Sequence, residues 1–135
     1  MSYKIEEIEG IGPAYAEKLR GAGISTTEDL LEKCATRKGR ESVAEVTDIS
    51  EKLILKWTNH ADLSRIKGVA GQFAELLEAA GVDTVKEFRH RVAANLYPRL
   101  VEVNEKRNLC NRVPSMAELE KMIEQAKVLE PKISY

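Results

Sequence analysis

The sequence contains very few residues that cross-link or bind metal: two cysteines, Cys34 and Cys110, and two histidines, His60 and His90. Two cysteines are too few for the disulfide framework of a small secreted protein. The four residues also show none of the spacings that are typical of structural zinc sites. We therefore expect buried, reduced thiols, and we expect neither a bound metal nor a cofactor.

No charge of one sign dominates the chain, which has 21 basic and 22 acidic residues and a formal net charge of -1. A protein that holds nucleic acid mainly by charge is usually strongly basic, so strong nonspecific DNA binding is not expected. Apolar runs of membrane-spanning length and the apolar segment of a signal peptide are also missing. We therefore expect a cytoplasmic protein without membrane contact.

The residues that are present favour a helical globular protein. Hydrophobic residues make up 43% of the 135 residues and charged residues 32%, with 5% aromatic residues and four prolines. Apolar positions recur at helical spacing, and no useful stretch alternates as a strand would. The predicted fold class is all-α, in one compact unit.

The chain contains an internal repeat. Residues 8–31 align without gaps with residues 66–89, and eight of the 24 positions are identical. After an insertion around "EKRNLCNR" the offset changes from 58 to 65, so that Trp57 aligns with Met122. The duplication spans nearly the whole chain. It predicts a first repeat at residues 1–64, a second at residues 65–130 and a tail at residues 131–135, within one structural domain.

The first repeat carries clear signals for the ends of helices. "IEEIEGIG" predicts a short helix that runs into a tight glycine turn, and Pro13 suits the first position of the next helix. Gly23 is expected to end that helix, and Thr26 with Asp29 predicts a capping box for the following one. Tyr15 has the spacing of an inward-facing residue and is expected in the core.

Equivalent signals follow later in the chain. Thr84 with Glu87 repeats the capping box of the first repeat, and "PSMAELEKMIEQAKVL" opens with Ser115 and has Glu118 in capping-box position. The helix around Trp57 is expected to start behind an N-cap at Asp48 or Ser50, with Trp57 on its buried face. The last helix is expected to end by Pro131, which leaves a short tail.

The pattern h-x-G-h-G-P-x-h-A-x-x-L-x-x-A-G-h, read from Ile8 to Ile24 with h for an apolar residue, resembles the helix-hairpin-helix motif of DNA repair and replication proteins. Over its full length, including "TTEDLLEKCATRKGRE" and the closing "RVPS", the chain is similar to a mostly bacterial family of tandem helix-hairpin-helix proteins catalogued as a domain of unknown function. The resemblance implies two helix-hairpin-helix repeats, each followed by two further helices.

The resemblance also implies a site. In DNA-binding members of the motif, backbone N–H groups of the glycine turn and of the next helix contact a phosphate, which the helix dipole favours. By matching position, Gly10, Ile11 and Gly12 form this turn in the first repeat, and Gly68, Val69 and Ala70 form it in the second. The basic residues predicted to add charge are Lys18, Arg20 and Lys67 near the turns, and Arg37, Lys38 and Arg40 in "RKGR".

The second turn departs from the pattern. Ala70 stands where the first turn has Gly12, and a Cβ disfavours positive φ. Gly71 stands where the first repeat has Pro13, which would preset the helix. We therefore expect the second hairpin to be the poorer anion site.

Other residues favour a function without nucleic acid. Ala14 and Gln72 stand where many DNA-binding hairpins have a cation, and Glu6, Glu7 and Glu9 crowd the first turn within a Debye length. Two hypotheses therefore remain. The first is contact with a DNA or RNA phosphate backbone through the first hairpin, with little sequence specificity. The alternative is a protein-protein interaction or assembly module that uses the same fold.

No motif indicates an enzyme. The sequence has no Ser/His/Asp or Cys/His set and no phosphate loop of the Walker type. Glu17 and Glu75 recur at equivalent positions of the two repeats, and a place on an exposed helical face would make them surface residues or members of surface ion pairs. We expect neither catalysis nor a small-molecule ligand.

Overall fold

A computed structural model describes residues 2–135, and in this range the fold is all-α, as predicted, with one isolated antiparallel bridge between Lys4 and Thr26. None of the helices in this range combines the length and the apolar character needed to cross a membrane. The elements are η1 (Ile5–Glu7, a 3-10 helix), α1 (Pro13–Gly21), α2 (Thr27–Cys34), α3 (Arg37–Thr47), α4 (Glu51–Leu63), α5 (Gly71–Ala79), α6 (Val85–Phe88), α7 (Ala93–Arg107) and α8 (Met116–Val128).

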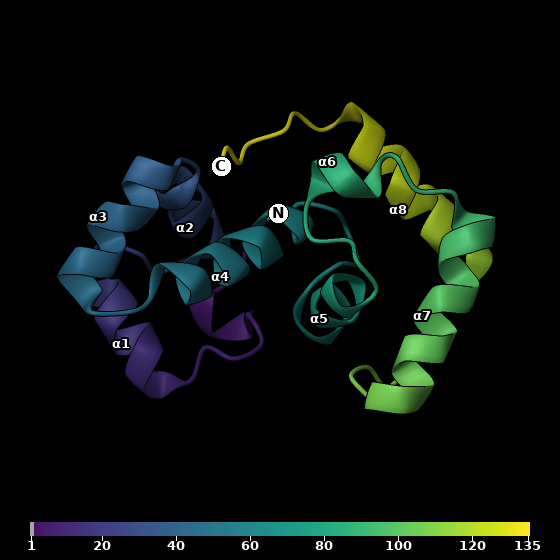
Figure 1. Cartoon of the computed structure of the whole chain (residues 1–135), viewed down its shortest axis with the longest axis horizontal. Helices are drawn as coiled ribbons and strands as arrows, with labels where there is room; N and C mark the ends of the chain where they lie inside the picture. Colours follow the sequence, from purple (N-terminus) through teal and green to yellow (C-terminus); the bar gives the residue numbers. More distant parts are fainter. Residues whose placement is uncertain (1) are drawn as a thin grey trace.

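The helices form two halves, with α1 to α4 in one and α5 to α8 in the other (Figure 1). In the first half α2 and α3 pack on α4, and in the second half α6 and α7 pack on α8. Helix α1 contacts α3 just as α5 contacts α7. The starts of α2 and α6 are 58 residues apart and those of α4 and α8 are 65 apart, as the sequence offsets require.

Each half has its own hydrophobic core. One cluster of buried residues runs from Ile5 to Ala61 and the other from Leu63 to Ala126, so the change of core falls near the end of α4. Asp62, which is 1% exposed, lies at this point. Its Oδ2 accepts a hydrogen bond from the Val85 N–H at 2.8 Å, which ties the end of α4 to the start of α6. Helix α4 therefore belongs to the first core and also anchors the second half.

The capping predictions are largely confirmed. Thr26 with Asp29, and Ser115 with Glu118, each make both hydrogen bonds of a capping box. Thr84 Oγ1 accepts from the Glu87 N–H at 3.2 Å, but the Glu87 carboxylate pairs with Arg91 instead of returning to the cap. That third box is therefore only half formed.

The N-cap of α4 is Ser50, whose Oγ accepts from the Leu53 N–H at 3.2 Å. Asp48, the other candidate, ends α3 in the left-handed conformation with φ 59°. Short polar residues tolerate this conformation better than most, so Asp48 serves as a C-cap.

Burial was predicted for four individual side chains, and the structure confirms it for two of them. Trp57 is buried, as predicted, but Tyr15 is 36% exposed and packs edge-on against Trp57 with ring centroids 5.0 Å apart. Cys34 is buried as predicted, whereas Cys110 is only half-buried and its Sγ lies 3.2 Å from the Arg112 carbonyl oxygen. Tyr15 lies at the edge of the helical packing, where periodicity does not distinguish buried from half-buried positions, and Cys110 lies in the loop between α7 and α8.

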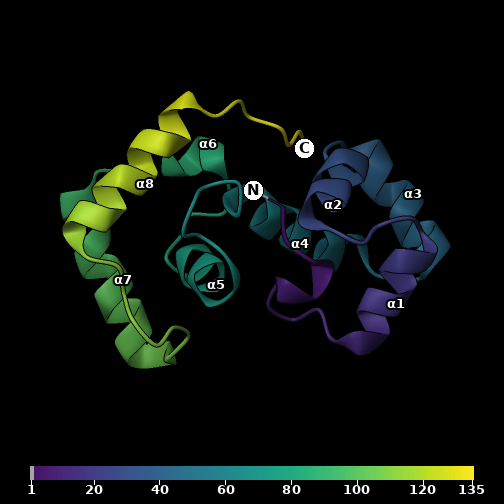
Figure 2. The ribbon, with the colours of Figure 1, turned by 180° about the vertical axis from the view of Figure 1, so that it is seen from behind.

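The tail after α8 returns to the first half (Figure 2). The Ser134 N–H donates to the Ala35 carbonyl at 2.8 Å, and the Tyr135 hydroxyl donates to Asn59 Oδ1 at 3.3 Å. Ile133 packs against the first core. The residues predicted as a short tail therefore form a strap that joins the second half to the first.

Candidate nucleic-acid interface

The start of α1 is open and without a side-chain cap. Its N-cap is Gly12, Pro13 occupies the first helical position as predicted, and the first turn has no acidic residue. Apart from its two chain neighbours, no atom of residues 2–135 lies within 4 Å of the position that a Cβ on Gly12 would take. Within residues 2–135 no acceptor is found for the N–H groups of Gly12, Ala14 and Tyr15. Backbone donors at the positive end of a helix are the elements of an anion site.

The predicted turn contributes fewer donors than its sequence implies. Gly10 adopts the positive φ (92°) that a glycine turn needs. The Ile11 N–H, however, already donates to the Ile8 carbonyl at 3.2 Å, and the Ile11 side chain is buried. Ile11 thus holds the turn together, and the donors available for a ligand come from Gly12 and the residues after it.

Each of the three glutamates near this turn has a neighbour elsewhere in the fold. Glu6 forms an ion pair with Arg20, and this pairing lowers the pKa of the Glu6 carboxyl. Glu7 Oε2 accepts from the Lys4 N–H at 3.1 Å. Glu9 Oε1 lies 4.0 Å from the position that a Cβ on Gly71 would take, beside the second hairpin. The ion pair with Arg20 reduces the repulsion that Glu6 would exert on a phosphate at the start of α1.

The start of α5 differs from that of α1 in what covers it, and not in the conformation of its N-cap residue. Gly12 and Ala70 are both N-caps with extended backbones, at φ -83° and -160°, so a Cβ at Ala70 causes no strain. The expectation that Ala70 disrupts a positive φ is therefore wrong. Positive φ occurs instead at Gly68 (90°) and Gly71 (50°). Gly71 is half-buried against the Glu7 carbonyl and the Glu9 carboxylate, and this contact covers the start of α5.

The basic residues near the two turns differ in whether their side chains form ion pairs. Lys18 and Lys67 are exposed, and no salt bridge involving their ammonium groups occurs within the described part of the chain. Arg20 is paired with Glu6 near the C-terminal end of α1. The Lys67 N–H donates to Gln125 Oε1 at 3.1 Å, which holds the second turn on α8 beside Gly68.

The "RKGR" residues lie away from the first turn. Figures 1 and 2 show the turn before α1 at the lower edge of the first half, whereas α2 and α3 meet at its upper edge. Arg37 forms an ion pair with Glu41 at 3.2 Å, and Lys38 is exposed. Arg40 is 4% exposed. The structure therefore does not bring this cluster together with Gly12.

Arg40 has a structural role that a basic cluster does not reveal. Its Nη1 donates to the carbonyls of Cys34 and Ala35 at 2.9 and 3.2 Å, and its Nη2 donates to the Ser134 carbonyl at 2.8 Å. The guanidinium carbon also lies 5.8 Å from the centroid of the Tyr135 ring. Arg40 holds the end of α2 and the C-terminal strap, so its charge is not available to an external phosphate.

A family model described as a domain of unknown function, DUF4332, matches residues 9–129. The chain belongs to this family. The match begins at the first glycine turn and ends after α8, so it covers both halves of the fold and all of the predicted site residues. Among curated proteins and among solved structures, no match to the chain was found.

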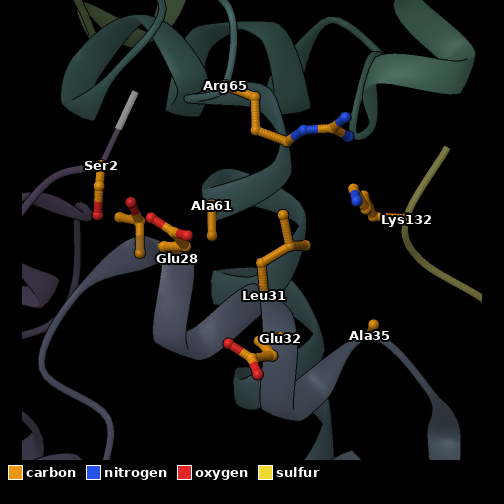
Figure 3. A pocket seen from close by; sticks show the side chains of 9 residues that line it. Ser2, Glu28, Leu31, Glu32, Ala35, Ala61, Arg65 and Lys132 are labelled. Carbon is orange, nitrogen blue, oxygen red and sulfur yellow. The ribbon is translucent and has the colours of Figure 1, made fainter. Parts of the chain in front are cut away.

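An open pocket of about 650 Å³ lies between α2, the end of α4 and the strap. Glu28 and Glu32 on α2 face Arg65 and Lys132 across it (Figure 3). Arg65 is already paired with Asp62 at 2.7 Å. The two carboxylates make this pocket a poor site for a phosphate backbone, so we do not include it in the interface.

Glu75 is not on an exposed helical face, in contrast to the expectation from sequence. Its side chain is 20% exposed and turns toward α4, where its Oε1 lies 3.5 Å from Lys56 Nζ. Glu78, one turn further on, faces the same helix. Glu17, the counterpart of Glu75 in the first half, is exposed as expected. The difference arises because α5 packs against α4. The internal repeat of the sequence does not predict this contact between the two halves.

Proposed function

We propose that the two halves are helix-hairpin-helix repeats and that the chain is a noncatalytic module that binds a nucleic-acid phosphate backbone through its first hairpin. One observation carries this proposal: the start of α1 has free backbone donors, no side-chain cap and no acidic residue in its first turn. Exposed Lys18, on the same helix, adds charge to this surface. The proposal keeps the cytoplasmic location expected from sequence.

The two hairpins differ in their suitability for a phosphate, so only the first is expected to contact the nucleic acid. At α1 a phosphate meets an open helix start, whereas at α5 it meets the Glu9 carboxylate beside Gly71. Like charges at such distances repel strongly, even in salt. One hairpin contacts few phosphates, so the affinity is expected to be low and the dependence on salt shallow. Backbone contacts alone carry no base information, and binding is therefore independent of sequence.

A substitution at Gly12 tests the proposal without harming the fold. Asp is a preferred N-cap residue, and the extended backbone and open surroundings of Gly12 accommodate it. Gly12→Asp is therefore expected to keep or raise the free energy of unfolding, while its carboxylate occupies the helix start and repels phosphate. Fluorescence anisotropy with a labelled duplex, a single strand and a junction at low salt is expected to show binding weakened by about tenfold or more.

Gly21→Asp is the matched control. Gly21 is also exposed, and no side chain of the described residues lies within 4 Å of its Cβ position, but it lies at the other end of α1. The net charge of the two variants is the same, so a nonspecific charge effect weakens both equally. A selective loss in Gly12→Asp supports the proposal. Equal losses, or no binding of the unmodified protein to any of the three nucleic acids, contradict it.

The alternative is a protein-protein interaction or assembly module. It is favoured by the position of "RKGR", which is remote from the first turn and has Arg40 buried, so the cations do not form one continuous strip. Affinity capture with and without nuclease distinguishes the two. A stoichiometric protein partner that survives nuclease treatment favours the alternative, whereas recovery that vanishes with nuclease favours the first proposal.

A further inference from the structure

Four polar side chains meet where α4 of the first half packs on α5 of the second. His60 Nε2 lies 3.1 Å from Glu78 Oε2, and Lys56 Nζ lies 3.5 Å from Glu75 Oε1 and 3.6 Å from Glu78 Oε1. The imidazole is 1% exposed, whereas the two carboxylates are 20% and 27% exposed. The cluster is therefore closed on the side of the histidine and open to solvent on the side of the carboxylates.

The histidine in this cluster uses only one of its two ring nitrogens. Its Nδ1 is buried and has no hydrogen-bond partner in the part of the chain that the structure describes. The ring therefore meets the cluster through Nε2 alone, at the Glu78 carboxylate.

The geometry and charge of the cluster suit a divalent cation. One ligand atom each from His60, Glu75 and Glu78 lie within 4.8 Å of one another. In a tetrahedral zinc site, ligand atoms ~2.1 Å from the metal lie about 3.4 Å apart, a spacing that small rotations of the two glutamates provide. The donors come from a single turn of α5 and one position of α4, which are rigid elements.

The Lys56 ammonium would compete with a metal ion for the two carboxylates. It bridges the two carboxylates in the present arrangement, as a cation would. The Lys56 side chain is 37% exposed, so it can move into solvent when a more highly charged ion arrives.

We propose that His60, Glu75 and Glu78 form a binding site for a divalent transition metal ion that joins the two halves of the fold. One imidazole and two carboxylates are a donor set for Zn²⁺ and its first-row neighbours, and a fourth position stays open toward solvent. The metal binds Nε2 of the neutral imidazole, and the one proton of the ring then lies on Nδ1. A cavity of about 10 Å³ that borders His60, Ser64 and Glu7 holds at most one water molecule, which would accept a hydrogen bond from the Nδ1 N–H.

Zn²⁺ titration of the untagged full chain by calorimetry tests the site, with Co²⁺ absorption as a second readout of coordination. We expect one ion per chain and a thermal midpoint that rises with metal concentration, because the ion binds only the folded state. Glu75→Gln and Glu78→Gln are each expected to weaken binding by about tenfold or more. Both side chains are partly exposed, so these variants are expected to fold.

Two further variants make the result decisive. Lys56→Met removes the competing cation and is expected to tighten binding by about tenfold. His90→Gln removes the other histidine, which is exposed, and is expected to leave binding unchanged. Failure of both the unmodified protein and Lys56→Met to bind Zn²⁺ overturns the proposal. So does binding that persists in Glu75→Gln and Glu78→Gln, or binding that disappears in His90→Gln.

Discussion

The indole of Trp57 lies directly against Gly10, with its Nε1 3.6 Å from the position that a Cβ on Gly10 would take. In the second half the methyl carbon of Met122 lies 3.1 Å from the equivalent position on Gly68. The last helix of each half therefore supports the glycine turn of the same half, with an aromatic side chain in one and a flexible one in the other. The turns are fixed by packing as well as by backbone conformation.

Replacing Gly10 should destabilise the fold through its backbone. At φ 92° an alanine pays the cost of a left-handed conformation, so Gly10→Ala is expected to lower the free energy of unfolding by about 1–2 kcal/mol. Gly21, a helical glycine without positive φ and with open surroundings, is the control. Gly21→Ala is expected to raise the same quantity by up to about 1 kcal/mol. Urea denaturation of both variants checks the opposite signs, and a stable Gly10→Ala would contradict the structure of the turn.

Arg40 should matter for folding and not for ligand binding. Lysine cannot reproduce its fork, which donates to three carbonyls, so Arg40→Lys is expected to lower the free energy of unfolding by about 2–4 kcal/mol. Arg37→Lys, an exposed change three residues earlier, should cost no more than ~0.5 kcal/mol. Chemical denaturation measures both. Reduced nucleic-acid binding by a fully stable Arg40→Lys would return this residue to the interface.

The two thiols should react at very different rates. Burial raises the pKa of Cys34 to about 11 and its side chain is 0% exposed, whereas Cys110 is half-buried. The thiolate is the reactive form, so at pH 8 only Cys110 is expected to be alkylated in the native protein. Mass spectrometry after brief alkylation should find one modification in the native state and two in denaturant. Cys110→Ser should abolish the native modification, and rapid labelling of Cys34 in that variant would argue against its buried position.

The contribution of Glu118, at the start of α8, to the stability of the fold should depend on pH. Hydrogen bonds from Arg112 and from Ser115 hold the pKa of this carboxyl at about 2, below its ordinary value of 4.5. A lowered pKa in the folded state stabilises the fold above pH 4.5, and this contribution is lost as pH falls toward 2. The difference in thermal midpoint between the protein and Glu118→Gln is therefore expected to shrink across that range. Glu120→Gln, on the exposed face of α8, should show no such trend.

The fold was largely predictable because its signals are local. The capping residues, Pro13 and the repeat offset indicated where α1, α2, α4, α6 and α8 begin. Packing between the halves was not predictable in this way. The aligned positions of Glu17 and Glu75 suggested equal exposure, but only Glu75 meets a helix of the other half.

The candidate site was predictable only in outline. The pattern identified Gly10 and Gly12, but not that the Ile11 N–H is used within the turn or that Glu9 lies beside Gly71. Hydrogen-bond partners depend on which segments fold back onto one another, and sequence spacing does not contain that information. A short basic run likewise gave no sign that Arg40 is buried, since its partner Ser134 lies 94 residues away.

The strap has a consequence for the order in which the protein folds during synthesis. Ile133 packs against the first core, and the Ser134 carbonyl accepts a hydrogen bond from the buried Arg40 guanidinium. The ribosome makes these residues long after α1 to α4 have emerged. During synthesis the first half therefore gains these two contacts only after translation has reached the strap, when α5 to α8 have already been made.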